Sequence, residues 1–216
     1  MTAFLQTLPE NPKEACCKLG LKVVQGMDFS LETVPGVMHH FPEHWTFREK
    51  LDLDDCKVLL LNVQLKEGME EMTEVGDVLL DPTTSHHQRE AMRTLVNELA
   101  GVCAKLGVSV VANQKVICPD LQDIFRRRGL LAIERLGTDT AQRLACLARG
   151  HIVQNVTAFL DSKDQLRWIG RVQRIRVRQV MDRPHLHFTD DRRPCVSVLV
   201  THWNEEECSE LEVNSL

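Results

Sequence analysis

Residues 107–153 read GVSVVANQKVICPDLQDIFRRRGLLAIERLGTDTAQRLACLARGHIV, and this stretch decides the fold class. An apolar run at 108–112 is followed by a polar loop and an amphipathic segment at 120–128. The same plan repeats with a run at 130–133 and a segment at 138–149, after which a third apolar run begins. Short apolar runs that alternate with helical periods predict parallel strands joined by crossover helices, so we expect an α/β core.

The strongest helical pattern precedes this stretch, at residues 85–106. Its apolar residues recur at spacings of three and four, which is typical of a buried stripe. Ser85 is the expected N-cap because its hydroxyl can accept hydrogen bonds from the first free amides. Gly107 stands where a C-terminal glycine is favoured. The stripe consists of Met92, Leu95, Val96, Leu99, Val102, Cys103 and Leu106.

Upstream of this helix, two apolar runs alternate with polar segments. The runs at 21–24 and 57–63 predict strands, and the near-continuous second run suits a strand covered on both faces. Residues 26–43 contain Pro35, Gly36 and Pro42, which favour a long surface loop. The segment 52–55 is interpreted as an acidic turn, and residues 66–81 as an acidic excursion away from the core.

The C-terminal part predicts antiparallel strands. Residues 170–180, GRVQRIRVRQV, alternate apolar side chains with arginines, as a half-exposed strand does. A returning strand is expected at 185–188 and a further apolar strand at 195–200. Asn204 is the expected cap of an acidic helix at 205–211.

The arginines of this strand allow two interpretations. They form the solvated face of an edge strand, whose charge discourages pairing with other chains. Alternatively, they bind phosphate groups of RNA or phospholipid, or an acidic partner. The strand has no interleaved aromatic residues to stack on bases, which favours the first interpretation. The arginines are Arg171, Arg174, Arg176 and Arg178.

The composition limits the function classes. The 216 residues are 43% hydrophobic, enough for one domain with a core, and the net charge of −5 weighs against nucleic-acid binding. The 8 cysteines lie mostly in apolar runs, so we interpret them as reduced thiols. No leader pattern and no run near the roughly 18 apolar residues of a membrane span is visible, so a cytoplasmic protein is expected.

Motifs for phosphate binding or acyl transfer are missing from the sequence. Neither GxGxxG, GxxxxGK[ST] nor GxSxG occurs, and the turn 113–119 contains no glycine. A small Rossmann-like enzyme or ligand-binding protein remains the alternative, with its site at the carboxyl ends of the strands. Its candidate residues are Asn113, Lys115 and Glu134.

Histidine pairs are the candidate metal ligands. The two residues of a His–His pair point to different sides of a helix or strand, and no CxxC or HxxxH spacing accompanies them. We therefore interpret them as surface or loop residues and expect no metal. The set comprises His39, His40, His44, His86 and His87, with Cys56 and Cys118 as additional candidates.

The order of these elements resembles the apical domain of group II chaperonins and their diverged relatives. The resemblance is carried by KVLLLNVQLK, by the excursion and long helix that follow, by the quoted central stretch and by RPCVSVLVTHWNEEECSELE. The QKVI and AIERLG segments are most similar to the McKusick–Kaufman/Bardet–Biedl chaperonin-like proteins. Residues 1–19 would be a partly disordered lead-in, 20–190 an apical-type α/β domain with a helical protrusion and an antiparallel hairpin, and 191–216 a return segment toward an intermediate domain.

The resemblance implies a module that binds polypeptide and assists folding or assembly of protein complexes, including the BBSome and cilium. No segment resembles the family's ATP-binding equatorial domain, so neither ATP nor catalysis is expected. The implied partners are client chains, Bardet–Biedl complex subunits or other chaperonin subunits, in the cytoplasm, centrosome or basal body. The implied client-binding residues lie on two helices, although the helical period also makes Leu121 and Phe125 core residues. They are Arg89, Arg93, Leu121, Gln122, Phe125 and Arg126.

Overall fold

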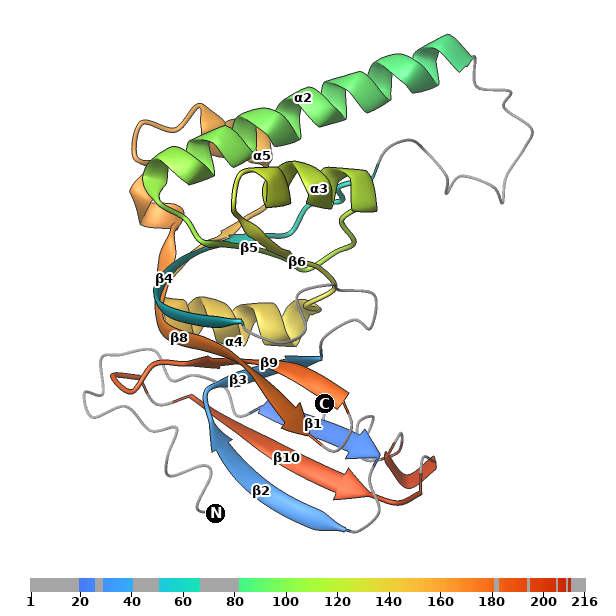
Figure 1. Ribbon diagram of the computed structural model, residues 1–216, viewed down its shortest axis with the longest axis vertical. Helices are drawn as coiled ribbons and strands as arrows, with labels where there is room; N and C mark the ends of the chain where they lie inside the picture. Colours follow the sequence, from blue (N-terminus) through green and yellow to red (C-terminus); the bar gives the residue numbers. More distant parts are fainter. Residues whose placement is uncertain are drawn as a thin grey trace. The chain divides into compact units, whose positions relative to one another are not determined.

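The computed structural model describes residues 20–25, 29–40, 51–66, 82–180, 183–193, 195–204, 206–208 and 210 (Figure 1). The chain divides into two compact units. The first comprises Met1–Cys56, Thr138–Gly150 and Arg171–Leu216, and the second comprises Lys57–Gly137 and His151–Gly170. The expected lead-in 1–19 and all of the expected excursion 66–81 except Lys66 lie outside the described residues. None of the described helices is long and apolar enough to cross a membrane.

The second unit is built on parallel strands. β5 (Val110–Asn113) pairs in parallel with β4 (Asp52–Leu61) on one side and with β6 (Leu131–Ile133) on the other. The short β7 (Ile152–Val153) is also parallel to β4. These strands coincide with the apolar runs of the sequence, and helices follow β4, β5 and β7 along the chain. The expected α/β core is confirmed.

The helices of this unit are α2 (Pro82–Leu106), α3 (Pro119–Arg127), α5 (Val156–Leu160) and the 3₁₀ turn η1 (Gln165–Trp168). The apolar stripe of α2 packs in one core with residues of β4, β5 and α3, as the 3,4 spacing predicts. The expected N-cap is wrong, because α2 begins at Pro82 and Ser85 lies inside it. Proline suits a first helical position, where its missing N–H would have no partner.

The C-terminus of α2 is held by β4. The Lys57 ammonium donates to the Leu106 carbonyl at 2.7 Å, which satisfies one of the last free acceptors of the helix. Gly107 has a φ of +70°, the left-handed conformation that favours glycine at this position. The predicted helix end is therefore confirmed.

The described residues of the first unit form strands, most of them antiparallel, together with helices. β1 (Gly20–Gln25), β10 (Val196–His202) and β2 (Ser30–Pro35) form one sheet in the order β1-β10-β2, with β1 parallel and β2 antiparallel to β10. A second set follows the order β3-β9-β8-β4, from β3 (Val37–His40) through β9 (Arg183–Thr189) and β8 (Gly170–Val180). The predicted hairpin of β8 and β9 is confirmed, although residues 181–182 lie outside the described part.

A buried arginine attaches α4 (Thr138–Ala148) to β10. Arg143 is 3% exposed, and its Nη2 donates to the Val196 carbonyl at 3.2 Å and to Ser197 Oγ at 2.6 Å. Ser197 Oγ in turn donates to the Gly36 carbonyl at 2.8 Å. This chain of hydrogen bonds compensates for the loss of hydration that burial of the guanidinium entails.

Two loops expected from the sequence are strands instead. Residues 26–43 contain β2 and β3, joined at Gly36 with a φ of +95°. A Cβ on Gly36 would lie 2.1 Å from the Phe188 carbonyl oxygen, so this glycine permits a tight turn against β9. The expected acidic turn at 52–55 is the first part of β4, in which neighbouring arginines pair with the aspartates.

The final polar segment begins as expected. The Asn204 side-chain oxygen accepts a hydrogen bond from the Glu206 amide at 3.0 Å, and residues 206–208 are helical. Asn204 therefore caps this helix as predicted. Cys208 lies in a small buried cluster with Val200 of β10.

Candidate functional site

The helices α2 and α3 lie side by side and run in the same direction (Figure 1). Near the start of the contact, Arg93 Nη2 donates to Asp120 Oδ2 at 3.0 Å. Near its end, Gly101 faces the guanidinium of Arg128, since a Cβ on this glycine would lie 3.0 Å from Nη1. The residues of the second contact come eight positions after those of the first in both segments, so the two helices run parallel.

Two of the six predicted client-binding residues are unavailable to a partner. Leu121 and Phe125 are fully buried, in the same core as Leu99 of α2. The prediction that they contact clients is therefore corrected, and their interpretation as core residues is confirmed. Their burial fixes the orientation of α3, so that the remaining faces of the helix carry polar residues.

The polar residues of α3 have defined roles. Gln122 is half-buried, and its Nε2 donates to the Ile117 carbonyl at 3.0 Å, which braces the turn before the helix. Arg126 is exposed and pairs with Asp123 one turn earlier, with 2.6 Å between Nη2 and Oδ1. Both residues lie at or near the surface, where exposed ion pairs contribute little to stability.

The side chains around the contact between α2 and α3 carry more positive than negative charges. Arg93 and Arg126 pair with the carboxylates of Asp120 and Asp123. Arg89, Arg127 and Arg128 are also exposed, and none of the carboxylates that the structure describes forms an ion pair with them. We call the exposed and half-buried polar side chains of α2, α3 and the C-cap of α3 that flank this contact the α2–α3 surface: Arg89, Arg93, Asp120, Gln122, Asp123, Arg126, Arg127 and Arg128.

Two of the three residues proposed for an enzyme site at the strand ends are buried and hydrogen-bonded to the backbone. Asn113 is fully buried; its Oδ1 accepts from the Val63 amide, and its Nδ2 donates to the Val63 and Lys115 carbonyls. Glu134 is buried and accepts from the Ile117 amide at 2.7 Å. These side chains hold the turn 113–117 in place, so of the three candidates only Lys115 projects into solvent.

The arginines of β8 are paired with acids of neighbouring strands. Arg174 contacts Asp54 at 3.2 Å and Arg176 contacts Asp52 at 2.8 Å, while Arg178 binds Glu32 on β2 at 2.8 Å. Arg171 binds Asp55, and this hydrogen bond lowers the pKa of the aspartate. Because β8 lies between β9 and β4, the edge-strand interpretation is wrong. The pairing also leaves these arginines less available to phosphate groups than the sequence pattern indicated.

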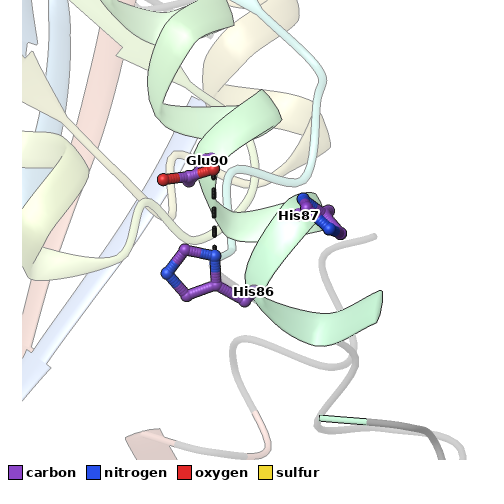
Figure 2. Close-up of side chains that lie close together, drawn as sticks. All are labelled: His86, His87 and Glu90. Carbon is purple, nitrogen blue, oxygen red and sulfur yellow. Dashed lines mark ion pairs between the residues drawn. The ribbon is translucent and has the colours of Figure 1, made fainter. Parts of the chain in front are cut away.

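The histidine pairs differ from each other. His39 in β3 is buried, which corrects its assignment to a surface or loop, and His44 lies outside the described residues. His86 and His87 are exposed on α2, as expected. They lie close to Glu90, so that one ligand atom from each residue falls within 4.8 Å of the others (Figure 2). The His–His pair alone gives no sign of this carboxylate, which lies one helical turn further along α2.

Comparison with known proteins gives the class. The chain belongs to the TCP-1/cpn60 chaperonin family, which matches residues 9–214. It is 25% identical over 161 residues to the thermosome subunit beta of Saccharolobus shibatae and to that of Saccharolobus solfataricus. Each match covers 74% of this chain and 28% of the relative, so the chain spans less than a third of those subunits.

Solved chaperonin structures share the fold. The open-state monomer of a group II chaperonin from Methanococcoides burtonii has a TM-score of 0.67 at 16% identity, over 98% of this chain and 46% of that one. A group III chaperonin in the open state has a TM-score of 0.66 at 16% identity, over 89% of this chain and 37% of that one. The chaperonin-like α/β fold implied by the element order is confirmed.

Proposed function

We propose that this chain is a chaperonin-like module that binds polypeptide through the α2–α3 surface and thereby assists folding or assembly of protein complexes. The observation that carries the proposal is the parallel pairing of α2 and α3 in a chain of this family. Arg89, Arg93, Gln122 and Arg126 are the contact residues, since Leu121 and Phe125 are buried.

The side chains of this surface define how binding would occur. Arginines offer several donors to carboxylates and carbonyl oxygens of an extended chain, with shallow contacts. The excess of positive charge favours client segments that contain Asp or Glu. Affinity for such segments would fall with ionic strength, because exposed charges are screened by salt.

We also propose that the chain itself neither binds nor hydrolyses ATP. In support, the side chains of Asn113 and Glu134 form hydrogen bonds with backbone groups at the turn 113–117. The turn contains no glycine, so it lacks the glycine-rich backbone that commonly binds phosphate. Incubation of the purified chain with ATP should release no phosphate above background. Turnover abolished by Glu134→Gln would contradict this part of the proposal.

The partners are proposed from the sequence resemblance. The McKusick–Kaufman/Bardet–Biedl-like segments suggest action in BBSome and cilium assembly, at the centrosome or basal body, with Bardet–Biedl or chaperonin subunits as partners. Co-precipitation of the tagged chain with Bardet–Biedl subunits from ciliated cells would test this assignment. Recovery of chaperonin subunits alone would contradict the BBSome part and keep the chaperonin part.

The binding surface is tested by charge reversal. Gln122→Glu and Arg126→Glu should each weaken capture of a chemically unfolded, fluorescently labelled client, and the double variant should weaken it further. Gln142→Glu, at an exposed position on α4, is the matched control that adds the same charge elsewhere. Equal capture by all variants would remove the α2–α3 surface from the proposal.

A further inference from the structure

The second and third turns of α2 carry three potential metal ligands that the chaperonin-like function does not use. His86 and His87 project from adjacent positions, and Glu90 follows one turn later (Figure 2). Nδ1 of His86 lies 3.8 Å from Oε2 of Glu90, and one ligand atom from each of the three residues lies within 4.8 Å of the others. All three side chains are exposed.

Helix geometry explains why a His–His pair can share a ligand sphere here. Successive residues are rotated by about 100°, so adjacent histidines alone diverge. Glu90 stands about 40° from His86 and about 60° from His87 around the helix axis, and therefore between them. It is an i+4 neighbour of one histidine and an i+3 neighbour of the other, the two spacings that bring side chains together.

The donor set suits a particular class of ion. Two imidazole nitrogens and one carboxylate oxygen form a combination that zinc and other first-row divalent metals favour, whereas magnesium prefers oxygen ligands. With bonds of about 2.0–2.2 Å, ligand atoms around a tetrahedral zinc lie about 3.3 Å apart. The 3.8 Å separation of His86 and Glu90 is close to this value, and rotation of the exposed His87 side chain shortens the longer separations.

We propose that His86, His87 and Glu90 bind a divalent first-row transition metal, with water in the remaining coordination positions. The ion would connect two successive turns near the start of α2, which begins at Pro82. Because the ligands lie four residues apart at most, the bound ion would stabilise the helical conformation of this turn. The site is open and exposed, so exchange with free metal should be fast.

Zinc titration of the full chain tests the proposal. Calorimetry should show binding that weakens about tenfold or more in each of His86→Ala, His87→Ala and Glu90→Gln. Magnesium should not compete. Zinc should also slow amide hydrogen exchange at residues 86–94 in the wild type and leave it unchanged in the triple variant. The control variants are His151→Ala and Glu98→Gln, which alter exposed residues of the same kinds elsewhere in this unit.

The zinc titration distinguishes binding at this site from binding elsewhere on the chain. Loss of zinc binding in the three ligand variants, with full binding in both controls, supports the site. Zinc affinity that is the same in the triple variant as in the wild type would overturn it, since other histidines would then account for the binding. The absence of zinc binding in the wild type would overturn it as well. The substituted side chains are exposed, and circular dichroism of each variant confirms that the chain is folded.

Discussion

Arg93 on α2 donates a hydrogen bond to Asp120 in the first turn of α3, with 3.0 Å between Nη2 and Oδ2. Both side chains are more than half exposed, so we expect this pair to orient the two helices rather than to stabilise the fold. A double-mutant cycle with Arg93→Ala and Asp120→Ala should give a coupling energy of about 0.2–1 kcal/mol in urea denaturation. A coupling above about 2 kcal/mol would show that the pair is a structural element.

Two glycines should respond in opposite ways to alanine. Gly36→Ala would place a Cβ against the Phe188 carbonyl oxygen in a left-handed conformation, so a loss of about 2 kcal/mol or more is expected. Gly101→Ala meets only the end of the Arg128 side chain, and alanine favours a helix by about 0.8–1.0 kcal/mol. Urea denaturation should therefore show destabilisation for the first and neutral or higher stability for the second. Equal losses in both variants would contradict this account of the two glycines.

The stability of the first unit should depend on pH through His187. Burial lowers the pKa of His187. The hydrogen bond between His187 Nε2 and the Pro35 carbonyl opposes this shift, and the positive charge of nearby Arg178 lowers the pKa further. The unfolded state then binds a proton at a higher pH than the folded state. The stabilisation is present above the ordinary histidine pKa of about 6.5 and is lost as pH falls from there toward the lower folded value.

His187→Gln removes this titrating group and should flatten the decline in stability below about pH 6.5. The measurement is the urea midpoint of wild type and variant across this range. His39, His40 and His185 lie on the same pair of strands and are present in both proteins, so the difference between the two proteins isolates the contribution of His187. A decline of the same size in both proteins would show that His187 is not a source of it.

The turn after β5 should depend on a buried carboxylate. Glu134→Ala leaves the Ile117 amide without its acceptor, so a loss of about 1–3 kcal/mol is expected. Glu134→Gln keeps an acceptor oxygen and should cost less. Thermal unfolding of the two variants checks this order, and a larger loss for Gln than for Ala would contradict the assigned hydrogen bond.

The sequence predicted the parallel core because its evidence is local. The stripe of α2 and the apolar runs of β4, β5 and β6 are visible within short windows, and burial follows from them. Features that depend on distant residues were missed. Gly36 lies between two strands because β9 packs against it, and Asp52, Asp54 and Asp55 belong to β4 beside arginines more than 100 positions away.

The same limit applies to the candidate site. Arg89, Arg93 and Arg126, which the resemblance implied as client-binding residues, are exposed, as contact with a client requires. The list nevertheless included Leu121 and Phe125, which the same period places in the core, and the structure buries both. The pairing of Arg93 with Asp120 joins separate helices, so no local pattern revealed it.

Site-specific crosslinking tests the central claim most directly. A photo-crosslinking amino acid is placed at Arg89 or Arg126 on the α2–α3 surface, and at Gln142 or Lys163 as exposed controls. Each chain is then mixed with a labelled unfolded client rich in Asp and Glu. The account predicts adducts at Arg89 and Arg126 that diminish with added salt, and few at Gln142 and Lys163. Adducts equally abundant at all four positions, or concentrated at the controls, would contradict polypeptide binding by the α2–α3 surface.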